Sequence, residues 1–350
     1  MNSLYNESDI PGHLLQYFEP AEIGMENTPG EFIDKLVDVF KEVKRVLRSD
    51  GTCWINLGDS YAGSGKSGST EEGRRKHKQF SKVETASRQV GPTKTGRIWP
   101  IAPGCKPSGM LKGKDLIGTP WMLAFAMRDD GWYLRNDIIW VKKTFSPESM
   151  KDRCTRSHEH IFMFSKTKQY YFDAEAIRKD TGANERDVWF IGLEHSREKH
   201  YAMYPTEIPR KIIKASTPQQ GVCGSCGAPY KRKLSKYRPG SYNPGEICKK
   251  TQAGWGKDFS TNRPLTSIYR DSGQMKITTI GWEASCNCNS NIIPSVVLDP
   301  FGGSCTTALV AAEMNRDAIM IDIKDEYLKI GQDRLKSANY SRLLHNIVYI

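Results

Sequence analysis

A glycine-rich turn late in the chain carries the residues best suited to binding a nucleotide-like ligand. Residues 299–307 read Asp-Pro-Phe-Gly-Gly-Ser-Cys-Thr-Thr, between an apolar run at 292–298 and a helix-prone run at 308–314. The apolar run predicts a buried strand, and a second one at 318–321 ends in Asp322. In such a strand–turn–helix–strand unit the glycines let the backbone approach a ligand, and the second acid suits a ribose diol. On this pattern alone, an ordinary crossover between two strands remains the alternative.

The amino-acid sequence of this turn resembles the S-adenosylmethionine-binding motif of DNA amino-methyltransferases, whose usual form is Asp-Pro-Phe-x-Gly-Ser-Gly-Thr-Thr. The chain departs from that form at Cys305, where the family has glycine. The resemblance implies that residues 299–303 line the methionine end of S-adenosylmethionine and that Asp322 holds its ribose hydroxyls. The implied cofactor-binding residues are Asp299, Pro300, Phe301, Gly302, Gly303, Ser304, Thr306, Thr307 and Asp322. A dinucleotide dehydrogenase is disfavoured, because Gly-x-Gly-x-x-Gly is absent from the turn.

Earlier segments resemble the same family in the same order. Apolar residues at 30–47 recur at helical spacing and predict an amphipathic helix of about five turns, which Gly51 stops. Residues 52–57 then predict a strand. The segments that resemble the family are 40–51, 56–61, 119–121, 130–140, 188–189 and 200–205. The last two of them, 188–189 and 200–205, resemble the segment that closes over the cofactor.

The position of the turn favours one order of the fold. It lies at residues 299–307 of 350, whereas a simple Rossmann enzyme would carry it near the N-terminus. In the circularly permuted beta class of amino-methyltransferases, the catalytic half comes first and the cofactor half last. The resemblance therefore implies the permuted order.

The catalytic signature of this family is not found. It reads Asp, Asn or Ser followed by Pro-Pro and an aromatic residue, which together grip the target amino group and stack on the flipped base. No Pro-Pro dipeptide occurs in the 350 residues, and Met1 starts about where the family would have finished this motif. We therefore expect a chain truncated after its catalytic loop, without the central strand that carries the loop, and its catalytic residues stay unassigned. A catalytically silent DNA-binding remnant is the alternative to an active enzyme.

Basic residues are concentrated in two segments. The chain carries 51 Lys and Arg against 40 Asp and Glu, a net charge of +11. Residues 62–114 hold 12 basic and 3 acidic side chains, and residues 221–290 hold 11 and 4. Such segments are expected to follow the phosphates of double-stranded DNA, with solvated loops as the alternative.

Four of the nine cysteines are spaced like metal ligands. Cys223 and Cys226 enclose Gly-Ser, and Cys286 and Cys288 enclose a single Asn. The first pair has the character of a zinc knuckle, whereas the second is spaced more closely than usual. Together they predict a tetrahedral structural Zn²⁺ with no open position for catalysis; Cys248 is a substitute ligand, and incidental thiols are the alternative. Cysteines without an evident signal peptide indicate a reducing compartment.

Two other features carry weaker expectations. His158 and His160 share one face of a predicted strand while Glu159 points the other way, which favours a structural role over a metal site. No apolar run approaches the about 20 residues of a membrane span. A soluble, cytoplasmic protein of a prokaryote or a phage is therefore expected.

The sequence as a whole predicts one large domain with two insertions. The expected fold is α/β, a Rossmann-like S-adenosylmethionine-dependent methyltransferase fold, circularly permuted, with a small zinc-binding insertion. Residues 1–61, 115–220 and 291–350 would form the methyltransferase domain, 62–114 a basic mobile insertion, and 221–290 a zinc-stapled basic module that is a candidate DNA-recognition element. The implied reaction moves a methyl group from S-adenosylmethionine to the exocyclic amino group of adenine (N6) or cytosine (N4) in DNA.

Overall fold

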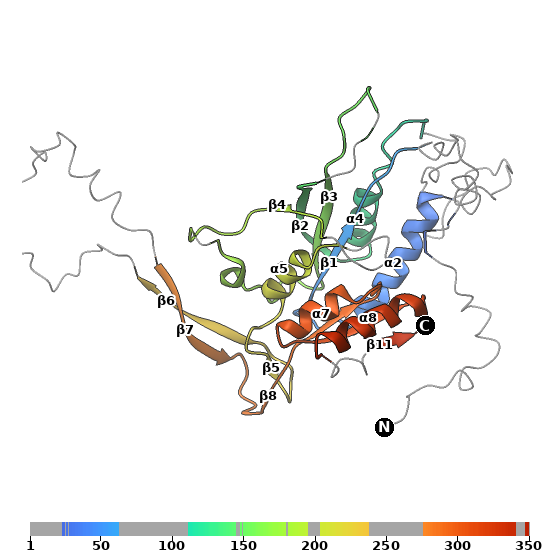
Figure 1. The fold of residues 1–350 in the computed structure, drawn as a ribbon. Helices are drawn as coiled ribbons and strands as arrows, with labels where there is room; N and C mark the ends of the chain where they lie inside the picture. The colour runs from blue at the N-terminus through green and yellow to red at the C-terminus, as the bar shows by residue number, and fades with distance from the viewer. Residues whose placement is uncertain are drawn as a thin grey trace, which may run out of the picture. The chain divides into compact units, whose positions relative to one another are not determined.

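The described part of the chain forms two compact units (Figure 1). Unit 1 comprises residues 1–170, 187–210 and 296–350, and unit 2 comprises 171–186 and 211–295. The computed structural model describes residues 23–24, 26, 28–62, 111–144, 148, 150–179, 181–194, 204–237, 276–340 and 347–349. Nearly all of the insertion predicted at 62–114 therefore lies outside the described residues.

Unit 1 contains a mixed sheet of four strands in the order β1-β3-β2-β4 (Figure 1). The strands are β1 (Thr52–Leu57), β2 (Tyr133–Lys142), β3 (His158–Ser165) and β4 (Val188–Ile191). Strand β3 is antiparallel to β1 and β2, while β2 and β4 are parallel. Leu57 lies opposite His160 and Val141 opposite His158, so β1 and β2 end at the same edge of the sheet.

Two helices of unit 1, α2 (Pro29–Val46) and α4 (Thr119–Asp129), share a hydrophobic core with this sheet. Helix α2 begins where the Thr28 side chain accepts a hydrogen bond from the Glu31 N–H at 3.1 Å, which satisfies one of the unpaired donors of its first turn. The core includes Ile33, Leu36, Phe40, Leu123, Met127, Phe162 and Phe164. The helix predicted at 30–47 and the strand predicted at 52–57 are thus confirmed.

A second sheet of unit 1 is parallel and has the order β11-β10-β9. Its strands are β9 (Val296–Asp299), β10 (Asp317–Asp322) and β11 (Ile347–Tyr349), with helices α7 (Thr306–Glu313) and α8 (Asp325–Ser337) in the connections. The register places Asp299 opposite Met320, so β9 and β10 end side by side. The strand–turn–helix–strand unit predicted around residues 299–307 is therefore confirmed.

The single buried strand predicted at 292–298 is wrong. Ile292 and Ile293 form β8, which pairs with β5 (Val222–Cys223) in unit 2, whereas β9 of unit 1 begins only at Val296. Pro294 separates the two strands, because proline has no N–H to donate to a ladder. Both residues of β8 are exposed, and Val296 is 58% exposed. The run is apolar without being a core strand.

Each sheet of unit 1 has an edge strand, β1 or β9, that is paired on one side only within the described residues. The turn that follows β9 lies against helix α2, since the Phe40 and Phe301 rings meet edge to face at a centroid distance of 6.2 Å. Burial, together with the Asp299 carboxylate of β9, raises the pKa of Cys53 in β1 to about 12. The expectation that a central strand of the sheet is missing stays a prediction, because no described residue tests it.

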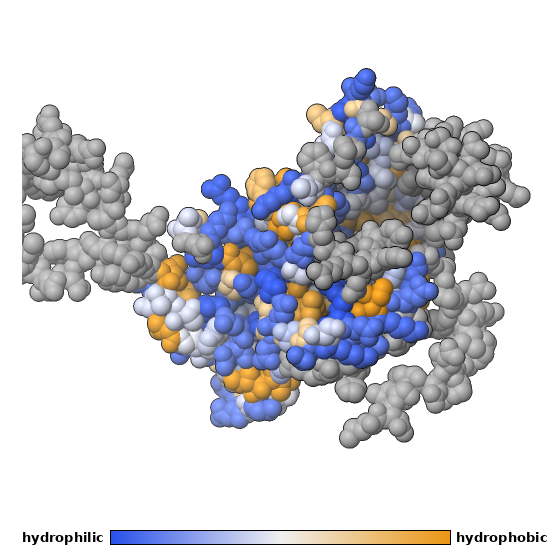
Figure 2. Space-filling view, viewed as in Figure 1, coloured by the Kyte–Doolittle hydropathy of each residue, from blue (hydrophilic) through white to orange (hydrophobic). Residues whose placement is uncertain are grey.

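Unit 2 is built around an antiparallel ribbon of two strands, β6 (Tyr230–Tyr237) and β7 (Lys276–Ala284). It also contains the β5–β8 pair and a short 3-10 helix, η2 (Ala174–Ile177), while helix α5 (Glu207–Ser216) spans the boundary between the units. None of the described helices combines the length and the apolar character that crossing a membrane requires. In the space-filling view, hydrophilic residues cover most of the visible face (Figure 2).

Candidate cofactor site and cysteine cluster

The carboxylate of Asp299 joins the end of β9 to the start of α7. One oxygen, Oδ1, accepts a hydrogen bond from the Phe301 N–H at 3.0 Å. The other, Oδ2, accepts one from the Thr307 hydroxyl at 2.6 Å. Because a buried turn needs its polar groups paired, these bonds fix the path of the chain between strand and helix.

Two glycines of the turn lie close to β10. Gly302 donates its N–H to the Ile321 carbonyl at 2.7 Å, and a Cβ at this position would come within 3.1 Å of Met320. Gly303 has a φ of +48°, in the left-handed region, and donates its N–H to Asp322 Oδ2 at 2.8 Å. The predicted ribose-binding acid thus contacts the turn directly, so the structure brings the two halves of the predicted site together.

Cys305 keeps the backbone conformation that glycine would adopt easily. Its φ is +59°, and the residue is 1% exposed at the N-terminus of α7. The thiol packs onto Gly331 of α8, where any Cβ would overlap the Cys305 side chain. From the same helix, Arg334 Nη1 donates to the Ser304 carbonyl at 2.6 Å and to Thr306 Oγ1 at 3.1 Å. Helix α8 therefore braces the turn in spite of the cysteine.

Tyr204 connects the end of the predicted cofactor-closing segment to the turn. Its hydroxyl lies 3.3 Å from Asp299 Oδ2 and also contacts the Thr307 hydroxyl. Burial of the hydroxyl, with the Asp299 carboxylate beside it, holds the pKa of Tyr204 well above its ordinary value. Residues 200–203 of the segment lie outside the described residues. The sequence did not predict an individual role for Tyr204. The only feature of the sequence that could have drawn attention to this residue is its position directly before Pro205.

Exposure separates the predicted cofactor residues into two groups. Ser304, Thr306 and Thr307 are at most 7% exposed, and their side chains make hydrogen bonds within the protein. Phe301 is 45% exposed and can meet a ligand. The buried group therefore shapes the turn, while the exposed Phe301 ring is open to contact with a ligand.

Asp59, which follows β1, caps helix α4 from a distance in sequence. The helix begins after Gly118, which has no side chain to cap it and a φ of +79°. Asp59 Oδ1 instead accepts hydrogen bonds from the N–H groups of Gly118 at 3.0 Å and Thr119 at 3.1 Å. A carboxylate is also favoured at the positive end of the helix dipole. The Asp59 carboxylate therefore has a structural role, as the cap of the first turn of α4.

Replacing Asp59 with alanine should destabilise the protein by about 1–3 kcal/mol, because two half-buried N–H groups at the start of α4 would lose their charged acceptor. Urea unfolding followed by tryptophan fluorescence measures the loss. Asp38→Ala is the matched control, since Asp38 makes only an exposed ion pair with Lys41 on α2. Such pairs contribute about 0–1 kcal/mol. A loss for Asp59→Ala no larger than that of the control would contradict the capping role.

The histidines of β3 have partners that suit a structural role. His160 Nδ1 lies 2.9 Å from Asp137 Oδ1, and its ring stacks on Phe162 with an interplanar angle of 5°. Glu159, on the opposite face, pairs with Lys142 at 2.5 Å. Desolvation and the neighbouring His160 lower the pKa of His158. These contacts hold β3 to its neighbour β2.

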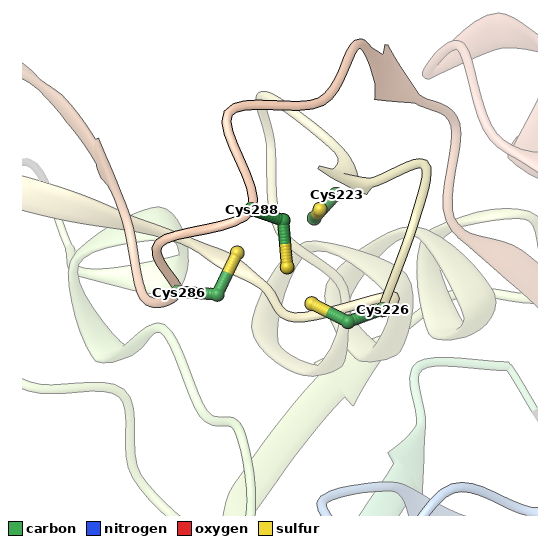
Figure 3. Close-up of side chains that lie close together, drawn as sticks. All are labelled: Cys223, Cys226, Cys286 and Cys288. Atoms are coloured by element: carbon green, nitrogen blue, oxygen red, sulfur yellow. The ribbon is translucent and has the colours of Figure 1, made fainter.

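Unit 2 holds four cysteine side chains in one cluster. The Sγ atoms of Cys223, Cys226, Cys286 and Cys288 all lie within 4.8 Å of one another. The side chains come from two segments far apart in sequence and converge (Figure 3). Within the described part of the chain, this is the group of at least three ligating side chains that is compact enough to hold a metal ion.

The backbone of the first cysteine pair is shaped to support a thiolate. The N–H groups of Cys226 and Ser225 point at the Cys223 sulfur and lower the pKa of its thiol to about 6. Gly227, with a φ of +69°, closes the turn by donating its N–H to the Cys223 carbonyl at 2.7 Å. Gly224 has no room for a Cβ, which would come within 2.7 Å of the Asn291 side chain. The two glycines therefore permit the tight turn in which backbone N–H groups face the Cys223 sulfur.

The remaining cysteines lie apart from this cluster. Cys53 and Cys305 are buried in unit 1, and Cys154 is exposed. Cys105 and the substitute ligand Cys248 lie outside the described residues. No disulfide joins any of the cysteines that the structure describes.

Known proteins match nearly the whole chain in sequence. The family model of the DNA methylases, N6_N4_Mtase, matches residues 8–224 and 287–333. The type II methyltransferase M.Cfr9I of Citrobacter freundii is 33% identical over 327 residues, which cover 92% of this chain and 77% of that protein. M.SmaI of Serratia marcescens, also a type II methyltransferase, is 32% identical over 328 residues, covering 92% and 80%.

Solved structures match more distantly. The PvuII DNA methyltransferase, specific for cytosine N4, is 14% identical with a TM-score of 0.47 and covers 92% of this chain and 80% of that one. A proposed DNA modification methylase from Thermus thermophilus, solved with S-adenosyl-L-methionine, is 16% identical with a TM-score of 0.44 and covers 91% and 82%.

Proposed function

Because the chain belongs to the N6/N4 DNA methylase family, we propose that the turn at residues 299–307 binds S-adenosylmethionine. The observation that carries this proposal is the hydrogen bond from the Gly303 N–H to the Asp322 carboxylate. It places the glycine turn and the acid next to each other at the carboxyl ends of the parallel strands β9 and β10. In open α/β sheets, ligands bind outside the carboxyl ends of the strands. The enzyme is a DNA amino-methyltransferase, and its methyl acceptor is the exocyclic amino group of adenine or cytosine.

The contacts of the turn suggest how this chain positions its cofactor. Asp299, Thr307 and Tyr204 form one hydrogen-bonded group that holds the turn closed against the start of α7. Bound there, S-adenosylmethionine would supply a sulfonium methyl group: the amino nitrogen bonds to the methyl carbon as the carbon–sulfur bond breaks, S-adenosylhomocysteine leaves, and the nitrogen gives up a proton. Alignment of that methyl group is what the rigid turn contributes, since a bound pair reacts at a much higher effective concentration.

The order of elements supports a circularly permuted arrangement. Strand β1 and helix α4 come early in the chain, whereas the proposed cofactor strands β9 and β10 come last. We leave the catalytic residues unassigned, because none of the described side chains matches the Pro-Pro-aromatic signature. Double-stranded DNA is the proposed substrate, and enzymes of this kind extrude the target base from the duplex.

Asp322→Ala should weaken S-adenosylmethionine binding by about 1–3 kcal/mol, the usual cost of losing a hydrogen bond to a charged group. Isothermal titration calorimetry with the full chain measures the affinity. Asp333→Ala is the matched control, because Asp333 is an exposed acid of α8 that pairs with Lys336. Equal affinities of the two variants would remove Asp322 from the site, and no binding by the wild type would contradict the proposed function.

We further propose that the four-cysteine cluster binds a structural Zn²⁺. Four thiolates at tetrahedral spacing match a closed zinc site, and the sulfur atoms within 4.8 Å of one another fit around one ion. With four protein ligands there is no open position, so the ion would hold unit 2 together and take no part in methyl transfer.

The same unit is the proposed DNA-recognition element. The match to the family model is interrupted between residues 224 and 287, which is the interior of the module predicted at 221–290. An insertion that the family model does not contain is a suitable place for properties that differ between family members. Its basic composition supports contact with phosphates.

A further inference from the structure

The β6–β7 ribbon of unit 2 is regular except at one point. Its register runs from Tyr230 opposite Ala284 to Tyr237 opposite Lys276. The register shifts where Lys233 faces Gly281 but the next residue, Leu234, faces Thr279. Ile280 is therefore an extra residue on β7, as in a β-bulge, and it is 66% exposed.

One face of the ribbon is fixed to the rest of unit 2. Arg232 of β6 donates from Nε and Nη2 to Asp173 Oδ2 at 3.0 and 2.9 Å, and its guanidinium lies 4.5 Å from the ring centroid of Trp282. Asp173 in turn caps the short helix η2 by accepting a hydrogen bond from the Ala176 N–H. The side chains of Arg232 and Asp173 are only 13% and 5% exposed. This inner face is thus committed to a structural contact.

The outer face of the ribbon is exposed and basic. Because side chains alternate along a strand, Lys231, Lys233 and Ser235 lie opposite to Arg232, and all three are exposed. Across the ribbon, Glu283 pairs with Lys233 at 3.0 Å, and Thr278 faces Ser235. The charged side chains described on this face are thus Lys231 and Lys233 with a single acid, Glu283.

One end of the ribbon is held by the cysteine cluster. Strand β6 begins four residues after Cys226, and β7 ends two residues before Cys286. Ser285 also donates its hydroxyl to the Pro229 carbonyl at 2.7 Å, which joins the two strands at this end. The outer face is therefore presented from a fixed base.

We propose that this outer face enters the major groove of the target duplex, with Lys231 and Lys233 on phosphates and with Thr278 and Ile280 towards base edges. The inference rests on the proposed function, and it names the surface that selects the DNA sequence. The major groove is about 12 Å wide and admits a two-stranded β-ribbon. The positive charge of the ribbon complements the phosphates, and an exposed apolar side chain can contact the methyl group of thymine.

The phosphate contacts are tested by the salt dependence of DNA binding. The full zinc-loaded chain is titrated with a pool of random-sequence duplexes over a range of salt concentrations. Lys231→Ala combined with Lys233→Ala should reduce the slope of log affinity against log salt by about 0.9 for each lost contact, about 1.8 in all. The control combines Lys329→Ala with Lys336→Ala, which removes two exposed lysines of α8. The control is matched because Lys336 pairs with an acid, Asp333, just as Lys233 pairs with Glu283. The control should keep the wild-type slope.

The base contacts are tested by selecting bound duplexes from the same pool. Ile280→Ala should lower the preference at one or more selected positions by about fivefold or more while leaving the salt slope unchanged. An unchanged slope for the lysine variant and an unchanged preference for Ile280→Ala would overturn the ribbon assignment. Cofactor binding and methyl transfer by the wild type, measured on the same samples, would then still support the proposed function. A wild type that binds neither cofactor nor DNA would contradict that function as well.

Discussion

Replacing Cys223 with serine should reduce the zinc content of the purified chain from about one ion to almost none, and should unfold unit 2 while unit 1 persists. Structural zinc supplies about 10–16 kcal/mol of apparent binding free energy in small domains, which is comparable to their whole stability. Unit 2 is expected to depend on the proposed ion in this way, because its ribbon has one face in solvent. Elemental analysis measures the metal, and hydrogen exchange resolved by segment measures the two units separately.

The control for this experiment is Cys154→Ser, which removes an exposed thiol outside the cluster. That variant should keep its zinc and its exchange pattern. Protein that was never exposed to a chelator and still contains no metal would contradict the zinc site. Uniform loss of protection over both units in Cys223→Ser would contradict the local role of the ion.

A fused upstream segment that carries the Asp/Asn/Ser-Pro-Pro-aromatic signature should raise methyl transfer about a hundredfold or more above that of residues 1–350. A side chain positioned for proton transfer to or from the reacting group typically raises the reaction rate by about 10²–10⁴-fold. The chain itself contains no Pro-Pro dipeptide, and Asp59, the acid that follows β1, is occupied at the start of α4. The measurement is incorporation of tritiated methyl groups into DNA with many candidate sites.

The matched control is the same fusion with Ala-Ala in place of Pro-Pro, which keeps the length and the added strand. It should bind cofactor as well as the active fusion does but transfer methyl groups far more slowly. Equal incorporation by residues 1–350, the fusion and the control would mean that other residues grip the amino nitrogen.

Features with local causes were predictable from the sequence. The helix at Pro29–Val46 follows from apolar spacing and from Thr28 as its cap, and both signals lie within the helix and its first flanking residue. The turn between β9 and α7 follows from its glycines, one of which needs a positive φ and one a close approach to β10. The cluster of four cysteines was also predicted, although its two pairs lie far apart in sequence, because the close spacing within each pair is a local mark of metal ligands.

Features that depend on distant partners were not predictable. The apolar composition of residues 292–298 could not show that Pro294 divides the run between two units. The division depends on β5, the partner strand of β8, which lies some 70 residues earlier in the chain. Asp59 likewise lies in a segment that resembles the family, but the sequence assigned it no role. Its role as the cap of α4 is visible only in the structure, where it accepts a hydrogen bond from Gly118. In each case the partner comes from another part of the fold and leaves no local pattern.

The packing of Cys305 against Gly331 has a consequence for the history of the chain. A side chain at position 331 would collide with the thiol, so the cysteine is acceptable only while α8 carries glycine there. A change from the family's glycine to cysteine at 305 is therefore tolerated only where position 331 is already glycine. The two sites are therefore epistatic: the order of their substitutions is constrained, and a larger residue at 331 would first require the cysteine to revert.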